Sequence, residues 1–337
     1  DLDADPMLEI VYGCLAPGLP TMVSVLDHTG ATEPGWPFVS PDIPDAMPVA
    51  ADLDGDGSPE IIIAGQPGGS IDSSIFAFHG DGTPANGFPV TFFSLGGNSA
   101  CTVADLDGDE RFEILLKTND HIEGVRSDGN PLAGFPLSID DELLSKPIQP
   151  SPAVGDMDGD GFLELFVVAN FDNVALYELD GLDSSDLLPW PMSGRSAARD
   201  GHYAEPSLRA DAHRVSAASG GTVQFALDAG TSNAGRLYLL WIGGSGSHPG
   251  TRLPGSGGPV YLPVNLDSFA QLALWSLNGP VFTGFGGTLD GQGRATASLN
   301  VPAPLPAGLI GTQFRLAYST AAPWDFVSEA IGILVIP

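Results

Sequence analysis

Four short stretches of this sequence place carboxylates at the first, third, fifth and ninth positions. The residues are Asp1, Asp3, Asp5 and Glu9; Asp52, Asp54, Asp56 and Glu60; Asp105, Asp107, Asp109 and Glu113; and Asp156, Asp158, Asp160 and Glu164. Alternate side chains of a tight loop can converge on one point, where several carboxylates repel one another unless a hard cation lies between them. The spacing therefore predicts three to four Ca²⁺ ions, each held by carboxylate oxygens.

Two other readings of these loops are weaker. An EF-hand needs a bidentate Glu at position twelve and a helix on each side. Position twelve of the four loops holds Tyr12, Ile63, Leu116 and Val167. A solvated Asp-Gly turn held by its own hydrogen bonds stays open as the plainer alternative. Fourfold repetition favours calcium, most clearly for the loops at 52, 105 and 156, because Ala4 and Pro6 replace the glycines of the first loop.

The acidic loops belong to a longer repeat of 51 to 53 residues. After each loop come an apolar segment, a turn rich in Gly and Asp, and a Gly or Pro beside an aromatic residue and a proline. These features occupy 23–37, 75–89, 122–136 and 174–191. Each period predicts four short antiparallel strands, one before the loop and three after it. That is the size of one propeller blade, whereas a β-solenoid, the alternative, repeats at about 20–30 residues.

These motifs resemble the FG-GAP/VCBS repeats of secreted bacterial proteins and of the integrin α-subunit propeller. The resemblance covers residues 1 to about 205 and implies a propeller, often seven-bladed, with Ca²⁺ between the first two strands of several blades. Residues 190–203 resemble the segment that ends such propellers. Fewer than four blades are present, so we expect a signal peptide and further sequence before Asp1, or a strand from another molecule, to complete the propeller.

Charge and composition divide the chain into a propeller region 1–192, a closing segment or linker 193–215, and a C-terminal β-sandwich 216–337. Residues 1–192 carry 34 Asp and Glu against 4 Lys and Arg, whereas residues 193–337 carry 8 of each sign. Seven apolar segments after 215 predict the sandwich strands. They are 221–229, 235–243, 259–265, 270–277, 295–301, 313–319 and 330–337. The predicted fold class is all-β, with four-stranded antiparallel blades followed by the sandwich.

For several residues of the chain two interpretations stay open. Trp241, Trp275 and Trp324 form either a sugar platform or, as we favour, part of the core. The last segment, 330–337, completes either its own sandwich or, less expectedly, a neighbour's sheet. Cys14 and Cys101 fit no zinc or redox motif, and a bridge between them stays open. His202 and His213 lie in the linker, where we expect them to be solvated.

Charge, the length of apolar runs and the motifs present also limit the classes of function that the sequence allows. The acidic excess disfavours nucleic acid and anionic membrane surfaces as partners. No apolar run reaches the ~18 residues of a membrane span, and no GxSxG, HExxH, P-loop or dinucleotide motif occurs.

We therefore predict a secreted, extracellular, calcium-stabilised structural, adhesive or assembly protein that is not an enzyme. Its expected partners are calcium, other copies of itself, and an extracellular protein or glycan. Two alternatives stay open. The chain is an accessory region of a larger secreted hydrolase, a peptidase or glycosidase, whose catalytic domain lies outside it, or it is a carbohydrate-binding module.

Overall fold

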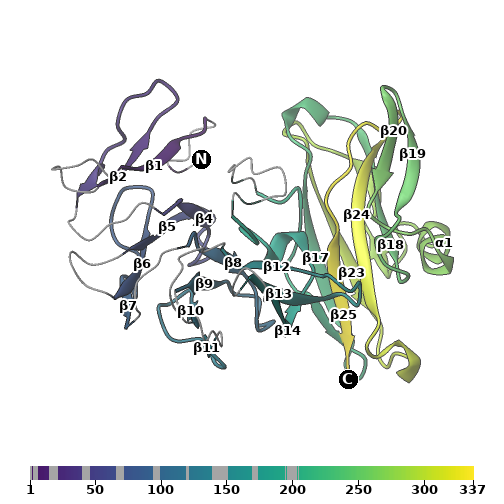
Figure 1. The fold of residues 1–337 in the computed structure, drawn as a ribbon. Coiled ribbons are helices and arrows are strands. Elements are labelled where there is room, and N and C mark those ends of the chain that lie inside the picture. The colour runs from purple at the N-terminus through teal and green to yellow at the C-terminus, as the bar shows by residue number, and fades with distance from the viewer. Residues whose placement is uncertain are drawn as a thin grey trace. The chain divides into compact units, whose positions relative to one another are not determined.

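The computed structural model describes most of the chain, in ranges separated by short gaps. These are 2, 7–14, 22–39, 46–65, 72–93, 99–118, 121–138, 151–168, 174–193, 195, 203 and 205–337. The chain forms two units. The first consists of Asp1–Met157, Phe162–Gly181 and Leu187–Tyr203, and the second of Asp158–Gly161, Leu182–Asp186 and Ala204–Pro337. Strands dominate both units (Figure 1), so the all-β prediction is confirmed.

In the first unit each repeat folds into a small antiparallel sheet. The strands are β1 Ile10–Cys14, β2 Met22–Leu26 and β3 Phe38–Val39; β4 Val49–Ala51, β5 Glu60–Gly65, β6 Ser73–Phe78 and β7 Val90–Phe92; β8 Thr102–Ala104, β9 Glu113–Lys117, β10 His121–Arg126 and β11 Leu137–Ser138; and β12 Ala153–Gly155, β13 Phe162–Val168 and β14 Val174–Leu182. Within each sheet the strands pair in chain order. The second and third repeats have the four strands expected. In both, the acidic loop lies between the first and the second strand.

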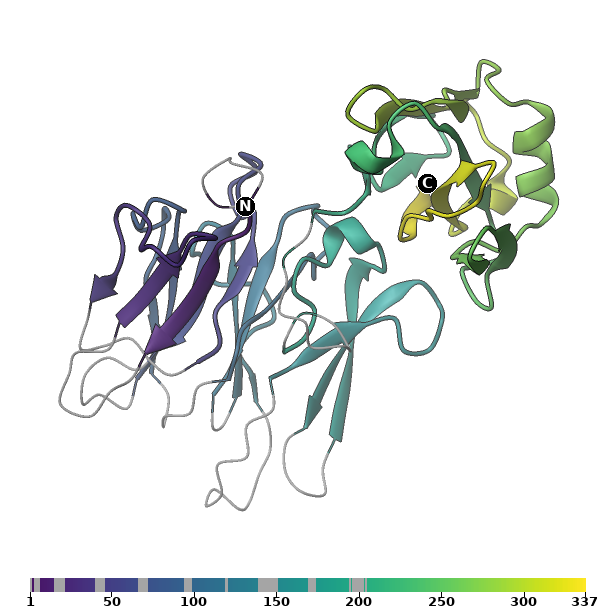
Figure 2. The ribbon, with the colours of Figure 1, turned by 90° about the horizontal axis from the view of Figure 1, so that it is seen from above.

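Apolar side chains on both faces of the central sheets join neighbouring repeats. Ile61 and Ile63 of β5 pack with side chains of the first repeat. Ile62 and Ala64, which alternate with them, pack with side chains of the third. The sheet of the second repeat therefore lies between two neighbours, and Figure 2 shows these sheets side by side. Strands buried on both faces explain why these segments are continuously apolar instead of alternating.

The Gly-aromatic-Pro element of a repeat lies against the Asp-Gly turn of the next repeat. A Cβ atom at Gly35 would overlap the carbonyl oxygen of Asp81, and one at Gly87 would overlap that of Asp128. Trp36 also donates from Nε1 to a backbone carbonyl of the second repeat at 2.8 Å. Glycine is needed at both positions because two backbones approach closely there.

We expect Gly87→Ala to destabilise the first unit more than Gly134→Ala. Both glycines precede Phe-Pro and have positive φ angles, 88° and 86°, so both variants carry the cost of a left-handed residue, about 1–2 kcal/mol. Only Gly87 faces the Asp128 carbonyl, and no described atom lies within 4 Å of a Cβ atom at Gly134. The overlap adds about 1–3 kcal/mol. Thermal unfolding checks the difference, and equal losses in melting temperature would contradict this account of the repeat contact.

The predicted last strand of the fourth repeat, near the aromatic-proline pair at 190, has a different place. Trp190 exchanges two backbone hydrogen bonds with Val103 of β8, at 2.8 and 3.1 Å, and Val154 of β12 donates to Pro191. The segment therefore pairs with the first strands of the third and fourth sheets. Trp190 is buried against the core of the second and third repeats, and this long-range contact overrides the regularity of the repeat.

The second unit is a sandwich of two sheets. Its strands are β15 Leu208–Ala210, β16 Arg214–Ser216, β17 Gly221–Asp228, β18 Leu237–Gly243, β19 Thr251–Gly255, β20 Gly258–Leu262, β21 Phe282–Thr283, β22 Gly286–Thr288, β23 Arg294–Val301, β24 Gln313–Ala321 and β25 Ile331–Ile336. One sheet has the order β15-β17-β23-β21 and the other β16-β25-β24-β18-β22, with β19-β20 as a separate hairpin. One core contains Phe225, Phe285 and Tyr318. Short 3-10 turns occur at Ser185–Leu187, Thr231–Asn233 and Ala307–Leu309.

The prediction that 270–277 forms a strand is wrong. The segment forms most of the helix α1, Ser268–Trp275. Asp267 caps this helix, because its Oδ1 accepts hydrogen bonds from the amides of Phe269 and Ala270 at 2.8 and 3.0 Å. Ala, Gln and Leu then favour the helix that the cap starts. Among the described residues no helix has the length and apolar character needed to cross a bilayer.

The linker prediction also differs from the structure, because 208–216 contains two sandwich strands. β15 pairs with β17, and β16 pairs in parallel with β25. His213, expected to be solvated, is buried, and its Nε2 lies 3.0 Å from Asp186 Oδ1. β25 lies between β16 and β24 in the sheet, so the last segment completes its own sandwich.

The structure places the three tryptophans and one of the two cysteines whose roles the sequence left open. Trp241 is buried and packs on Trp324, with ring centroids 5.9 Å apart, whereas Trp275 on α1 is 84% exposed. The three therefore do not form one platform. Cys101 is a buried free thiol whose pKa burial raises to about 12. The side chain of Cys14, like His202, lies outside the described residues.

Candidate metal centres

The structure brings carboxylates of three acidic loops together. Oxygen atoms within 4.8 Å of one another come from Asp52, Asp54 and Asp56; from Asp105, Asp107 and Glu113; and from Asp156, Asp158 and Glu164. Asp109 and Asp160 are described but stand outside these groups, and Asp1, Asp3 and Asp5 lie outside the described residues. In the second repeat, Glu60 groups with Asp54 and with His79, which the sequence analysis did not select.

The Glu at position nine closes each loop in the same way. One of its oxygens, Oε2, accepts a hydrogen bond from the amide that follows the first Asp position. The pairs are Leu2 with Glu9 at 2.6 Å, Leu53 with Glu60 at 2.7 Å, Leu106 with Glu113 at 2.8 Å, and Met157 with Glu164 at 2.6 Å. This bond fixes the start of the loop to the following strand.

The first Asp shapes the loop from inside. Asp52 accepts hydrogen bonds from the amides of Gly55 and Gly57, at 2.8 and 2.9 Å. Asp105 accepts the equivalent bonds from Gly108 and Glu110, at 2.7 and 3.1 Å. These bonds need positive φ angles at the donor positions. The loops therefore hold the shape of an Asx-type turn by themselves. The carboxylate oxygens that do not take part in these hydrogen bonds are the ones available to a metal ion.

Two buried oxygens distinguish these loops from plain turns. Glu113 and Glu164 are at most 1% exposed, and Oε1 of each accepts no hydrogen bond from any described residue. An isolated buried carboxylate oxygen is costly. A carboxylate oxygen of each glutamate lies within 4.8 Å of oxygens of two Asp side chains. A hard dication is the species that this arrangement fits, since it would coordinate the buried oxygen and remove the repulsion.

Several carboxyl groups of the acidic loops have raised pKa values. Burial, together with a smaller effect of neighbouring carboxylates, raises the pKa of Glu113 to about 8 and that of Asp105 to about 6. Burial also raises the pKa values of Asp52 and Glu60 above their ordinary values. Carboxyl groups with raised pKa values resist ionisation, and a bound cation would reverse that preference.

The residue at the end of the third strand differs from repeat to repeat. In the third repeat Arg126 donates from Nη2 to Asp107 Oδ2 at 2.8 Å, and its Nη1 lies 3.8 Å from Asp109 Oδ2. In the second repeat the matching residue is His79, whose Nδ1 lies 3.0 Å from Glu60 Oε1. Alignment of the apolar segments 75–82 and 122–129 could have identified this position, but not its contact with the preceding loop.

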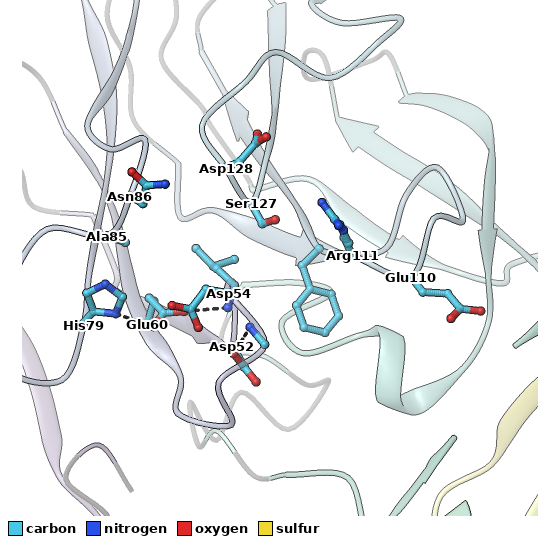
Figure 3. A pocket seen from close by; sticks show the side chains of 13 residues that line it. Asp52, Asp54, Glu60, His79, Ala85, Asn86, Glu110, Arg111, Ser127 and Asp128 are labelled. Atoms are coloured by element: carbon cyan, nitrogen blue, oxygen red, sulfur yellow. Dashed lines mark hydrogen bonds and ion pairs between the residues drawn. The ribbon is translucent and has the colours of Figure 1, made fainter. Parts of the chain in front are cut away.

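A cavity of about 490 Å³ opens beside the second loop. Asp52, Asp54, Glu60 and His79 line one side, and Arg111, Ser127 and Asp128 of the third repeat lie across it (Figure 3). The cavity therefore lies between two neighbouring sheets of the first unit, next to the candidate metal ligands.

Comparison with known proteins finds a similarity for part of this region. Residues 52–116 match the family model of an FG-GAP-like repeat. The match runs from the second acidic loop to β9, so it includes the loops at 52 and 105. Among solved structures, the chain is similar to the biofilm matrix protein Bap1 of V. cholerae, with 14% identity, a TM-score of 0.31, and coverage of 98% of this chain and 70% of that one. No curated protein sequence matches this chain.

Proposed function

We propose that this chain is an extracellular, calcium-stabilised structural or adhesive protein whose repeats form part of a propeller, and that it is not an enzyme. One observation carries the proposal. Glu113 and Glu164 each hold one oxygen on a backbone amide and keep the other buried, without a hydrogen bond from the described residues, beside two Asp side chains. The FG-GAP-like repeat match over 52–116 supports it.

In this proposal Ca²⁺ joins each acidic loop to the strand that follows it. The position-nine Glu supplies the oxygen on the strand, and the Asp residues supply those of the loop. Repulsion between carboxylates then becomes attraction to a shared ion, so the loop becomes rigid. Four ions carry eight positive charges and would reduce the formal net charge from −30 to about −22. Extracellular calcium near 1 mM fills sites of even modest affinity.

The proposal includes assembly through apolar residues that are exposed on the first and the last sheet of the first unit. Ile10 of β1 and Val39 of β3 are 59% and 51% exposed, and Val174 of β14 is 61% exposed. Ile61 and Ile75 of the second repeat, which correspond to Ile10 and Val174, are buried against a neighbouring sheet. Exposed apolar side chains on a sheet favour contact with another sheet, and in this proposal other copies of the chain or an extracellular partner supply it.

Sedimentation velocity in 1 mM Ca²⁺ and in excess chelator tests the assembly. We expect species larger than the 34.8 kDa monomer in calcium, lost in chelator and in Ile10→Asp. Tyr261→Asp is the matched control, because Tyr261 is 62% exposed but lies in the sandwich. A monomer in calcium would instead favour an accessory region of a larger secreted hydrolase. Saturable glycan binding by that monomer would favour a carbohydrate-binding module.

A further inference from the structure

The second repeat differs from the others by an imidazole at its acidic loop. Ligand atoms of Asp54, Glu60 and His79 lie within 4.8 Å of one another. His79 Nδ1 and Glu60 Oε1 are 3.0 Å apart, and the Glu60 side chain is 2% exposed against 34% for His79. In Figure 3 the imidazole and the two carboxylates point toward one another at one side of the cavity.

The matching residues of the other repeats cannot supply this nitrogen. Arg126 in the third repeat pairs with Asp107, and a guanidinium has no lone pair to give to a metal. Asp27 and Glu178 occupy the position in the first and fourth repeats. The second repeat therefore has a mixed nitrogen and oxygen donor set, whereas the donors grouped in the described loops at 105 and 156 are oxygens.

Nitrogen in the donor set changes which metal fits. Ca²⁺ takes oxygen ligands, whereas imidazole with carboxylates suits Zn²⁺ and similar divalent transition metals. Metal-ligand bonds of about 2.0–2.1 Å in a tetrahedral site put neighbouring ligand atoms roughly 3.3 Å apart. The 3.0 Å between Nδ1 and Oε1 is close to that separation, so a small rearrangement would admit the ion.

We propose that Asp54, Glu60 and His79 form a transition-metal site, best suited to Zn²⁺, which shares Asp54 and Glu60 with the second acidic loop and at which Zn²⁺ displaces Ca²⁺. Three protein ligands leave a fourth coordination position open. The cavity of about 490 Å³ provides space for it, with Asn86 and Ser127 on its wall. A water molecule or a carboxylate or hydroxyl group of a ligand is the expected occupant of that position. Binding of Zn²⁺ by these three ligands does not depend on the proposed calcium function.

Calorimetric titration of ZnCl₂ into the full chain in 1 mM Ca²⁺ tests the site. We expect one Zn²⁺ per chain whose affinity falls at least tenfold in His79→Gln. His121→Gln is the matched control, since His121 Nε2 also lies close to a glutamate, Glu123, at 2.7 Å, but outside the acidic loop. It should bind Zn²⁺ as the unmodified protein does. Co²⁺ in place of Zn²⁺ should give visible absorption of a tetrahedral site that His79→Gln loses.

Each outcome has one meaning. No Zn²⁺ binding in calcium, or equal binding by His79→Gln, would overturn the inference. Stabilisation by calcium, measured as the melting temperature of the same samples, reports separately on the proposed function. His79→Gln should keep that stabilisation, which also establishes that the variant folds.

Discussion

Removing calcium is expected to lower the melting temperature of the first unit by about 15–30 °C. A site with calcium at 100 times its dissociation constant stabilises the folded state by about 2.7 kcal/mol, so three sites give about 8 kcal/mol. For a region of this size each kcal/mol corresponds to about 2–4 °C. Differential scanning calorimetry in 1 mM Ca²⁺ and in excess chelator measures the shift.

Variants of the acidic loops make that measurement specific. Asp54→Ala and Asp107→Ala should each lower the melting temperature in calcium by several degrees and change it little in chelator. Asp81→Ala is the control from the same unit, because Asp81 accepts hydrogen bonds from Thr83 at 2.6 and 2.9 Å on an exposed turn outside the acidic loops. It should lose the same amount in both media. If Asp54→Ala behaved like this control, calcium would not be what the loop binds.

The repeat was predictable because its signals are local. Acidic positions, turn glycines and apolar segments follow one another at a fixed spacing, and the strands of the second and third repeats formed where that spacing placed them. The structure also groups Asp105, Asp107 and Glu113, three of the residues predicted at one loop. Calcium itself stays a prediction, since its evidence is the shape and burial of these groups.

The features that sequence reasoning missed depend on contacts between distant segments. His79 and Arg126 reach loops of their own repeats from the end of the third strand, 19 residues beyond the side chains they contact. Trp190 left the expected strand because Val103 and Val154 offered unpaired backbone groups. Helix α1 was mistaken for a strand because a short, mostly apolar run suits both elements, and only the Asp267 cap distinguishes them.

Only one of the two roles of the Glu at position nine was predicted from the sequence. Glu60, Glu113 and Glu164 were predicted as metal ligands, but no sequence pattern indicated that one oxygen of each would accept a hydrogen bond from a backbone amide. That bond leaves one oxygen for a cation instead of two. A Gln side chain could keep the amide contact through its carbonyl oxygen while removing the charge, which allows the two roles of Glu113 to be separated.

Glu113→Gln is expected to change the sign of its effect with the medium and the pH. Burial raises the pKa of Glu113 from its ordinary 4.5 to about 8. A carboxyl group with a raised pKa stabilises the folded state below pH 4.5, and this contribution is lost as the pH rises through 8. In chelator at pH 9 the unmodified protein therefore buries an unfavourable charge that the variant lacks. We expect the variant to melt about 5 °C higher there, and at nearly the same temperature at pH 5.

In calcium the order should reverse, because the charge that destabilises the metal-free loop is the one that binds the ion. At pH 8 and 1 mM Ca²⁺ the variant should melt about 5 °C or more below the unmodified protein. Glu123→Gln is the matched control, a buried glutamate of the same repeat outside the acidic loop, and its effect should not change sign. Equal destabilisation of Glu113→Gln in both media would mean that Glu113 serves only as the acceptor for Leu106, because a purely structural hydrogen bond does not depend on calcium.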